Sequence, residues 1–252
     1  VPYLDPRASR SPNPDHRAYP ALLEARLREA NPGRAIEVLP LAVPGYSSHQ
    51  GLAWLRRDIA RLEPDLVTAC FGWNDISKRN QTDARTMAAD PLSVAARRIV
   101  GSSQALLHAR RWLGARSRDP APGWATSPRV PRQAYVENLL AIAALARAHG
   151  AVPVLLGPLY RDRVSFPPEG AEIAAYREAL KTAAAERGVP YLEFQELTEA
   201  SYPENRRFFA EHIHPNHRGH ALVAGRLLAF LSERRLLGGL AVPPGLTPAA
   251  QE

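Results

Sequence analysis

The 252-residue chain combines 45% hydrophobic with 23% charged residues and carries a formal net charge of +7. These values are typical of a globular protein that is long enough to bury a sizeable core. No run approaches the ~20 apolar residues of a membrane span, and arginine is spread along the predicted helices, so we expect neither a transmembrane segment nor a nucleic-acid partner.

In chain order, the hydrophobic pattern alternates between helical and strand-like segments. Apolar residues at helical spacing predict amphipathic helices, and Gly150 and Gly188 mark the ends of two of them. Short apolar runs between the helices predict strands that are covered on both faces. The predicted order is helix 19–30, strand 36–43, helix 50–62, strand 65–71, helix 133–149, strand 152–156, helix 169–187, strand 190–194 and helix 218–235.

This alternation predicts an α/β fold in which parallel βαβ units build a doubly wound sheet between helical layers. We expect a single domain over residues 1–235. The region 76–132, with a helix at about 91–113, is predicted to be a helical insertion, either a lid over a pocket or a longer surface excursion. Residues 236–252 are rich in Gly, Pro and Ala and are predicted to form a flexible tail.

Three short motifs lie in the loops between these elements. PGYSS at 44–48 follows the first predicted strand, GWND at 72–75 follows the second, and EHIHPNHRGH at 211–220 lies between the last strand and the last helix. Reactive groups of open parallel sheets gather in loops beyond the carboxyl ends of the strands. The three motifs therefore predict one site at one edge of the sheet.

His214 is the candidate general base of this site. Pro215 stiffens the loop beside it, and Glu211 stands three residues upstream. A carboxylate that accepts a hydrogen bond from one ring nitrogen fixes the tautomer and leaves the other nitrogen basic. The spacing therefore predicts an acid–histidine pair.

Asn74 and Gly45 are candidate donors to a negatively charged oxygen. A side-chain amide can stabilise an oxyanion, and the loss of one such donor typically costs ~2.7–4 kcal/mol of barrier. Gly45 lets the backbone approach a ligand closely and offers its N–H to the same oxygen. We expect Asp75 to brace its loop through hydrogen bonds rather than to react.

Four neighbouring histidines raise the question of a zinc site: His212, His214, His217 and His220. Their spacing matches no common zinc signature, and Pro215 would separate them. We therefore expect no metal, with His220 packed at the start of the last helix and His217 exposed. The chain has no phosphate-binding P-loop and no dinucleotide-binding glycine motif, so no cofactor is expected.

With these residues in hand, the chain resembles the SGNH (GDSL-type) hydrolase family over about residues 19–231. PGYSSHQGL resembles the family's glycine block, FGWND its Gly-x-Asn-Asp block and FFAEHIHPNHRGH its Asp-x-x-His block. The resemblance implies a flavodoxin-like, three-layer α/β/α fold. It also implies that Gly45 and Asn74 form the oxyanion hole and that His214, paired with Glu211, is the catalytic histidine.

Two features depart from the family pattern. Glu211 stands where the family has Asp, so one more methylene separates the carboxylate from the backbone. The Gly-Asp-Ser block, which supplies the nucleophile after the first strand, is not found: Ser9 and Ser11 lack its context, and Ser47 and Ser48 belong to the glycine block. We expect the first strand to be missing, through a truncated N-terminus or a wrongly assigned start, with a true pseudoenzyme as the alternative.

The resemblance implies an ester hydrolase, an esterase or lipase that acts on a small-molecule or carbohydrate ester by serine–histidine acyl transfer. Without its nucleophile, the chain alone is predicted to be inactive. The alternatives are an O-acyltransferase or deacetylase acting on polysaccharide, and a non-catalytic binding module. The sequence leaves open the acyl and alcohol parts of the substrate, the oligomeric state, and whether the protein is cytoplasmic or exported.

Overall fold

The computed structural model describes residues 17–79, 81–88, 127–159, 167–194, 204–211 and 213–243. Within them, long helices alternate with short strands. The principal elements are α1 (Tyr19–Ala30), α2 (Ser48–Leu62), β1 (Leu66–Cys70), α7 (Arg132–Ala148), β4 (Val152–Leu156), α8 (Pro167–Glu186), β5 (Tyr191–Leu192) and α9 (His217–Glu233). The shorter ones are α3 (Trp73–Ile76), β2 (Lys78–Arg79), α4 (Asp83–Met87), β3 (Ser127–Pro128) and the 3₁₀ helix η4 (Glu204–Phe208).

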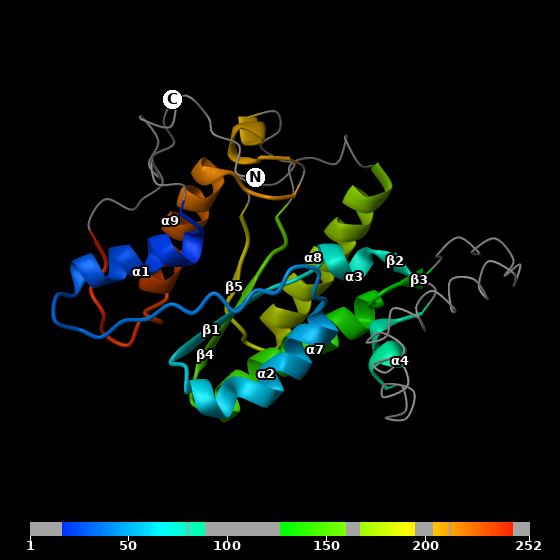
Figure 1. Cartoon of the computed structure of the whole chain (residues 1–252), viewed down its shortest axis with the longest axis horizontal. Coiled ribbons are helices and arrows are strands. Elements are labelled where there is room, and N and C mark those ends of the chain that lie inside the picture. The colour runs from blue at the N-terminus through cyan, green and yellow to red at the C-terminus, as the bar shows by residue number, and fades with distance from the viewer. Residues whose placement is uncertain are drawn as a thin grey trace, which may run out of the picture.

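The central sheet is parallel, with the strand order β1-β4-β5 (Figure 1). Leu66 pairs with Val152 at one end of the β1–β4 ladder and Cys70 with Leu156 at the other. Leu156 in turn pairs with Leu192. Since the strands run in the same direction, the loops that follow β1, β4 and β5 all leave the sheet at one edge.

Helices cover both faces of this sheet, which confirms the predicted three-layer, doubly wound arrangement. Along β4, Val154 and Leu156 belong to the core beneath α1 and α9, and Leu155 belongs to the core beneath α2, α7 and α8. Figure 1 shows the two helical layers on opposite sides of the strands. This alternation follows from the two-residue period of a strand, and each fully buried Leu or Ile contributes about 1.5–3 kcal/mol.

The helix boundaries agree with the predictions to within two residues. α1 has the predicted bounds, and α7 gives way at His149 to Gly150, which has φ 78°. A positive φ at this point lets the chain turn directly into β4, and only glycine adopts it without strain. Local sequence therefore determines the ends of these elements.

The strand predicted at 36–43 is wrong. The Val38 N–H donates to Glu24 Oε2 at 2.7 Å, and the Ile36 carbonyl accepts from Arg28 Nε at 2.7 Å, so α1 side chains take up these backbone groups. At Pro40 the chain makes a three-residue turn, from the Leu41 N–H to the Leu39 carbonyl at 3.0 Å. Proline supplies no N–H to a sheet ladder and interrupts strand pairing.

The predicted insertion and tail lie partly outside the described residues. Of the insertion, the structure describes α4 and the antiparallel β2–β3 pair, and the helix predicted at 91–113 falls in the part that is not described. Leu236, Leu237, Leu240 and Val242, which precede the undescribed residues 244–252, pack against the core beneath α1 and α9. The Asn31 side chain holds the backbone N–H and carbonyl of Ala241 at 2.7 and 2.9 Å.

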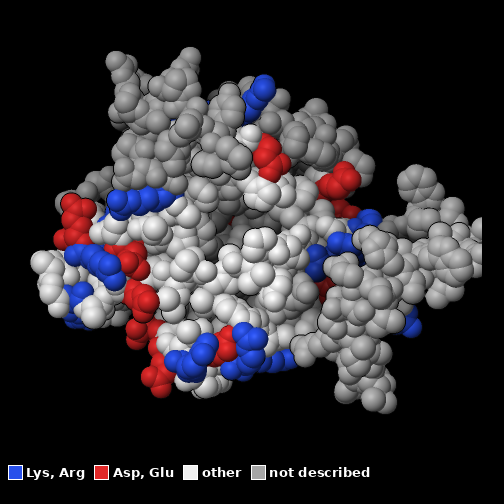
Figure 2. Space-filling view, viewed as in Figure 1, with Lys and Arg blue, Asp and Glu red and all other residues white. Residues whose placement is uncertain are grey.

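The described surface mixes both signs of charge. On the face shown in Figure 2, Lys and Arg side chains lie beside Asp and Glu side chains over the described helices. Among the helices that the structure describes, none is both long and apolar enough to cross a bilayer.

Candidate active site

The PGYSS motif forms a tight turn in front of α2. The Tyr46 N–H donates to the Val43 carbonyl at 3.1 Å, and Gly45 has φ 81°. Proline at the second position and a glycine with positive φ at the third are the signature of a type II turn. Among the described residues, the Gly45 N–H meets no acceptor, so it remains available to a ligand.

Asn74 lies beside this turn. It follows β1, in the short helix α3, and its Nδ2 donates to the Tyr46 carbonyl at 3.1 Å. A primary amide has two N–H groups, so this bond orients the side chain and leaves the second N–H for another acceptor. The structure thus brings Gly45 and Asn74, which are 29 positions apart, into one hydrogen-bonded unit.

Asp75 braces the loop that carries Asn74 through hydrogen bonds, as the sequence predicted. Its Oδ1 accepts the Ser48 N–H at 2.9 Å and the Ser48 hydroxyl at 2.5 Å, which ties α3 to the start of α2. The carboxyl is fully buried, and its Oδ2 meets no donor among the described residues. Burial raises the pKa of Asp75 from 3.8 to about 6, outweighing the lowering effect of the hydrogen bonds from Ser48.

Sequence reasoning missed a second buried group, formed by Arg129 and Asp83. Arg129 Nη2 lies 2.8 Å from Asp83 Oδ2, and Nη1 donates to the Gly45 carbonyl at 2.8 Å. Asp83 Oδ2 also accepts the Ser47 hydroxyl at 2.5 Å. Burial acts to raise the pKa of Asp83, but the hydrogen bonds from Arg129 and Ser47 prevail and lower it. No sequence signal separates Arg129 from the many arginines of the chain.

Glu211 and His214 form the predicted pair in a small hairpin after η4. The Ala210 N–H donates to the His214 carbonyl at 2.9 Å, and this turn brings the Glu211 carboxylate against the ring. Oε1 of Glu211 lies in hydrogen-bond contact with Nδ1 of His214. The longer acid therefore reaches the ring, and a proton held at Nδ1 leaves Nε2 as the basic nitrogen. Both side chains are exposed.

Asn216 fixes this hairpin to α9. Its Oδ1 accepts the N–H groups of Arg218 and Gly219 at 2.9 and 3.1 Å, and its Nδ2 donates to the Arg207 carbonyl at 2.8 Å. Asparagine before a predicted helix is a common N-cap, so this role could have been inferred from the sequence. The cap holds the His214 loop against the rigid start of the helix.

His217 and His220, the neighbours of this pair at the start of α9, both take packing roles. His220 stacks on Tyr19 with a ring-centroid separation of 6.3 Å, as predicted for a packing residue. His217 was predicted to be exposed and is instead buried, because it begins α9 on its inner face. In the part of the chain that the structure describes, no three Asp, Glu, His or Cys side chains gather in a metal-binding arrangement.

The predicted site residues thus form two pairs, Gly45 with Asn74 and Glu211 with His214. No hydrogen bond between described residues joins His214 to the Gly45–Asn74 unit. Asn74 follows β1 and His214 follows β5 along the chain, and the chain leaves these parallel strands at the same edge of the sheet.

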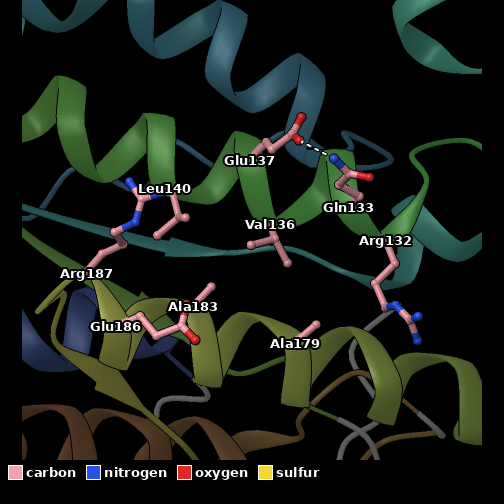
Figure 3. A pocket seen from close by; sticks show the side chains of 9 residues that line it. All are labelled: Arg132, Gln133, Val136, Glu137, Leu140, Ala179, Ala183, Glu186 and Arg187. Atoms are coloured by element: carbon pink, nitrogen blue, oxygen red, sulfur yellow. Dashed lines mark hydrogen bonds between the residues drawn. The ribbon is translucent and has the colours of Figure 1, made fainter.

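A groove of about 390 Å³ lies elsewhere, between α7 and α8. Figure 3 shows Val136, Ala179 and Ala183 along it, with the Gln133–Glu137 hydrogen bond of 2.9 Å at its rim. None of the four predicted site residues lines it. Because the chemistry-bearing side chains are absent from this groove, we do not assign the active site to it.

We predict that Gly219→Ala destabilises the His214 loop. A Cβ at Gly219 would overlap the Phe208 carbonyl oxygen and lie 2.8 Å from Pro215 Cβ. Overpacking of this kind costs about 1–3 kcal/mol, to be measured by urea unfolding. The matched control is Gly225→Ala in the same helix, where the nearest atom is 3.5 Å away and helix propensity favours alanine by about 1 kcal/mol. Equal stabilities of the two variants would contradict this packing.

We also predict that Asp75 makes stability fall as pH rises from about 4 to about 6. The folded-state pKa is raised to about 6, so in this window the folded state binds more protons than the unfolded state. The loss amounts to about 3 kcal/mol, at about 1.4 kcal/mol for each pKa unit. Asp75→Asn keeps an acceptor for Ser48 and should remove this slope. An unfolding free-energy difference between the two proteins that does not change with pH would contradict the prediction.

Solved structures share this fold. A catalytic mutant of the acetylxylan esterase Axe2 from Geobacillus stearothermophilus aligns with a TM-score of 0.57 at 16% identity, over 85% of this chain and 81% of that chain. LAE5, an α/β hydrolase enzyme from the metagenome of Lake Arreo, Spain, aligns with a TM-score of 0.56 at 18% identity, over the same shares. The acetyl xylan esterase AlAXEase aligns with a TM-score of 0.56 at 14% identity, over 84% of this chain and 89% of that chain. At these identities the likeness concerns the fold.

A comparison with curated protein sequences finds no match. The model of the GDSL-like lipase/acylhydrolase family, in contrast, matches residues 8–222, a span that contains all three motifs and most of the chain. The resemblance inferred from the sequence is therefore confirmed, and the chain belongs to the GDSL-like lipase/acylhydrolase family.

Proposed function

We propose that the protein hydrolyses an acyl ester through a serine nucleophile, with His214 as general base. The observation that carries this proposal is the unit of Gly45 and Asn74, in which one backbone N–H and one amide N–H are left without an acceptor among the described residues. Two such donors suit the oxygen of a tetrahedral intermediate, which gains negative charge as the nucleophile attacks.

The proton moves through His214. Its Nε2 takes the proton of the attacking serine hydroxyl and passes it to the alcohol that leaves when the ester bond breaks. Water then attacks the acyl-serine and gives a proton to the same nitrogen; as the bond between the acyl carbon and the serine oxygen breaks, Nε2 returns that proton to the serine oxygen, and the carboxylic acid is released. Glu211, in contact with Nδ1, stabilises the imidazolium that forms in each half of the reaction.

The nucleophile is proposed to be neither Ser47 nor Ser48. Both residues are fully buried, and both hydroxyls already donate at 2.5 Å to a carboxylate, Asp83 and Asp75 respectively. A hydroxyl held in this way cannot reach a substrate carbonyl without breaking the bracing of α2. We propose that the attacking serine belongs to a Gly-Asp-Ser block that is not part of the 252 residues.

Acetyl esters of a carbohydrate are the proposed substrate class. Two of the similar structures are acetylxylan esterases, and the proposal extends their substrate to this chain on the strength of the shared fold. Acetylated xylan is therefore the first polymer to assay, by the release of acetate. Transfer of acetyl to an added sugar acceptor, in place of acetate release, would favour an O-acyltransferase on the same residues.

A fluorophosphonate probe tests the assignment of the nucleophile. We predict that the 252-residue chain forms no adduct, and that a gene product which includes a Gly-Asp-Ser block forms one at the serine of that block. Mass spectrometry of the digested protein locates the adduct. An adduct at Ser9, Ser11, Ser47 or Ser48 in the folded chain would show that the nucleophile lies within these residues.

Kinetics of a gene product that carries the proposed nucleophile test the remaining roles. His214→Ala should lower kcat for p-nitrophenyl acetate by about 10⁴–10⁶-fold, and Asn74→Ala by about 10²–10³-fold with little change in KM. The control is His149→Ala, an exposed histidine after α7, at the opposite edge of the sheet. If His214→Ala retained the wild-type rate, the proposed mechanism would be wrong.

A further inference from the structure

The guanidinium of Arg129 is the centre of a buried network around the Gly45 turn. Its Nε and Nη2 bind the Asp83 carboxylate at 2.8–3.2 Å, Nη2 also donates to Gln50 Oε1 at 2.8 Å, and Nη1 donates to the Gly45 carbonyl at 2.8 Å. Gln50 Oε1 accepts the Ser47 N–H at 3.1 Å in turn. One side chain therefore holds both ends of the segment that links the turn to α2.

Every carbonyl of the turn from Gly45 to Ser47 has a partner. The Gly45 carbonyl binds Arg129, the Tyr46 carbonyl binds Asn74, and the Ser47 carbonyl accepts the Gly51 N–H at 2.9 Å. The Gly45 N–H meets no acceptor among the described residues. The network thus holds the carbonyl groups of this segment and leaves the Gly45 N–H free of any acceptor among the described residues.

The direction of the Gly45 N–H depends on the conformation of the turn and on the place that the turn takes beside Asn74. Type I and type II turns differ by a rotation of the central peptide, which reverses the direction of its N–H. In the PGYSS turn that peptide joins Pro44 to Gly45, and its N–H is the proposed oxyanion donor. Pro44 and the positive φ of Gly45 select the type II state, and the bond from Arg129 to the Gly45 carbonyl holds the next peptide of the turn in its place.

We propose that Arg129 is a positioning residue that holds the Gly45 turn in place beside Asn74, so that the Gly45 N–H points at the oxyanion. The inference rests on the proposed function and adds a residue that is about 84 positions from Gly45 in sequence. Its bond to the Gly45 carbonyl fixes the peptide on one side of Gly45, and Asp83 and Gln50 fix the guanidinium. Arg129 touches no reacting atom and acts through the backbone of the turn alone.

Arginine is required for this task by its geometry. The five N–H groups of a guanidinium form a rigid planar fork, and here they reach a carboxylate, an amide oxygen and a backbone carbonyl together. A lysine ammonium is a single point charge, so it can keep the ion pair with Asp83 but cannot span all three acceptors. Arg129→Lys therefore separates the positioning role from the charge.

The experiment compares Arg129→Lys with Arg177→Lys. Arg177 pairs with Glu193 at 2.8 Å, and the exposed fractions of these two side chains, 9% and 13%, match the 11% and 12% of Arg129 and Asp83. The control thus makes the same substitution in a comparable buried ion pair outside the Gly45 turn. Both variants are made in the gene product that carries the proposed nucleophile and assayed with p-nitrophenyl acetate, and both are made in the ¹⁵N-labelled chain for NMR.

We expect Arg129→Lys to lower kcat by about 10–100-fold, because a misplacement of about 1 Å can cost about 100-fold, with KM within about twofold. The Gly45 amide and Asn74 side-chain signals should shift or broaden. Arg177→Lys should keep kcat within about twofold and leave both signals in place, even if it lowers the melting temperature as much. If Arg129→Lys kept the wild-type kcat and Gly45 signal, the inference would be overturned.

Two further variants separate a failure of the proposed function from a failure of the inference about Arg129. His214→Ala is assayed in parallel: if it retains activity, the proposed function has failed, and the NMR signals alone then decide whether Arg129 positions Gly45. Should Arg129→Lys fail to fold, Asp83→Asn takes its place, since it keeps the Arg129 bond to Gly45 but removes its anchor. A smaller loss of kcat with a shifted Gly45 signal supports the inference, and no change in either overturns it.

Discussion

Arg129 and Asp83 form an ion pair in the interior, and Arg129 also binds the backbone of the Gly45 turn. Removal of one member of a buried ion pair costs about 3–5 kcal/mol, because the other charge is left uncompensated. Here the pair also carries hydrogen bonds to the Gly45 carbonyl and the Ser47 hydroxyl. We infer that the same ion pair contributes to the stability of the fold and holds the turn that carries the Gly45 N–H.

The parallel sheet supplies the second constraint. Because β1, β4 and β5 run in the same direction, the chain leaves β1 ahead of Asn74, and β5 ahead of His214, at the same edge of the sheet. Hydrogen bonds then refine each position locally: Asn74 is oriented by the Tyr46 carbonyl, and the His214 hairpin is attached to α9 by Asn216. Rigid elements thus carry short loops, and each loop presents one or two chemically useful groups.

Much of this arrangement could be predicted from the sequence, because helical periodicity and terminal glycines are local signals. α1 and β4 have the predicted bounds, and the Glu211–His214 contact follows from a three-residue spacing in a turn. The prediction of a strand at 36–43 was wrong because Pro40 supplies no N–H to a ladder and side chains of α1 bind the backbone groups that a neighbouring strand would need. Arg129 was missed because its partners, Asp83 and Gly45, lie 46 and 84 positions away, and only the fold brings them together.

The most direct test of this account is a crystal structure of the active protein with a phosphonylated nucleophile. The phosphonyl oxygen takes the place of the oxyanion. We expect it to lie within about 2.7–3.1 Å of both the Gly45 N and Asn74 Nδ2, with Nε2 of His214 directed at the serine oxygen. A phosphonyl oxygen that meets neither donor, or a His214 ring turned away from the serine, would contradict the account.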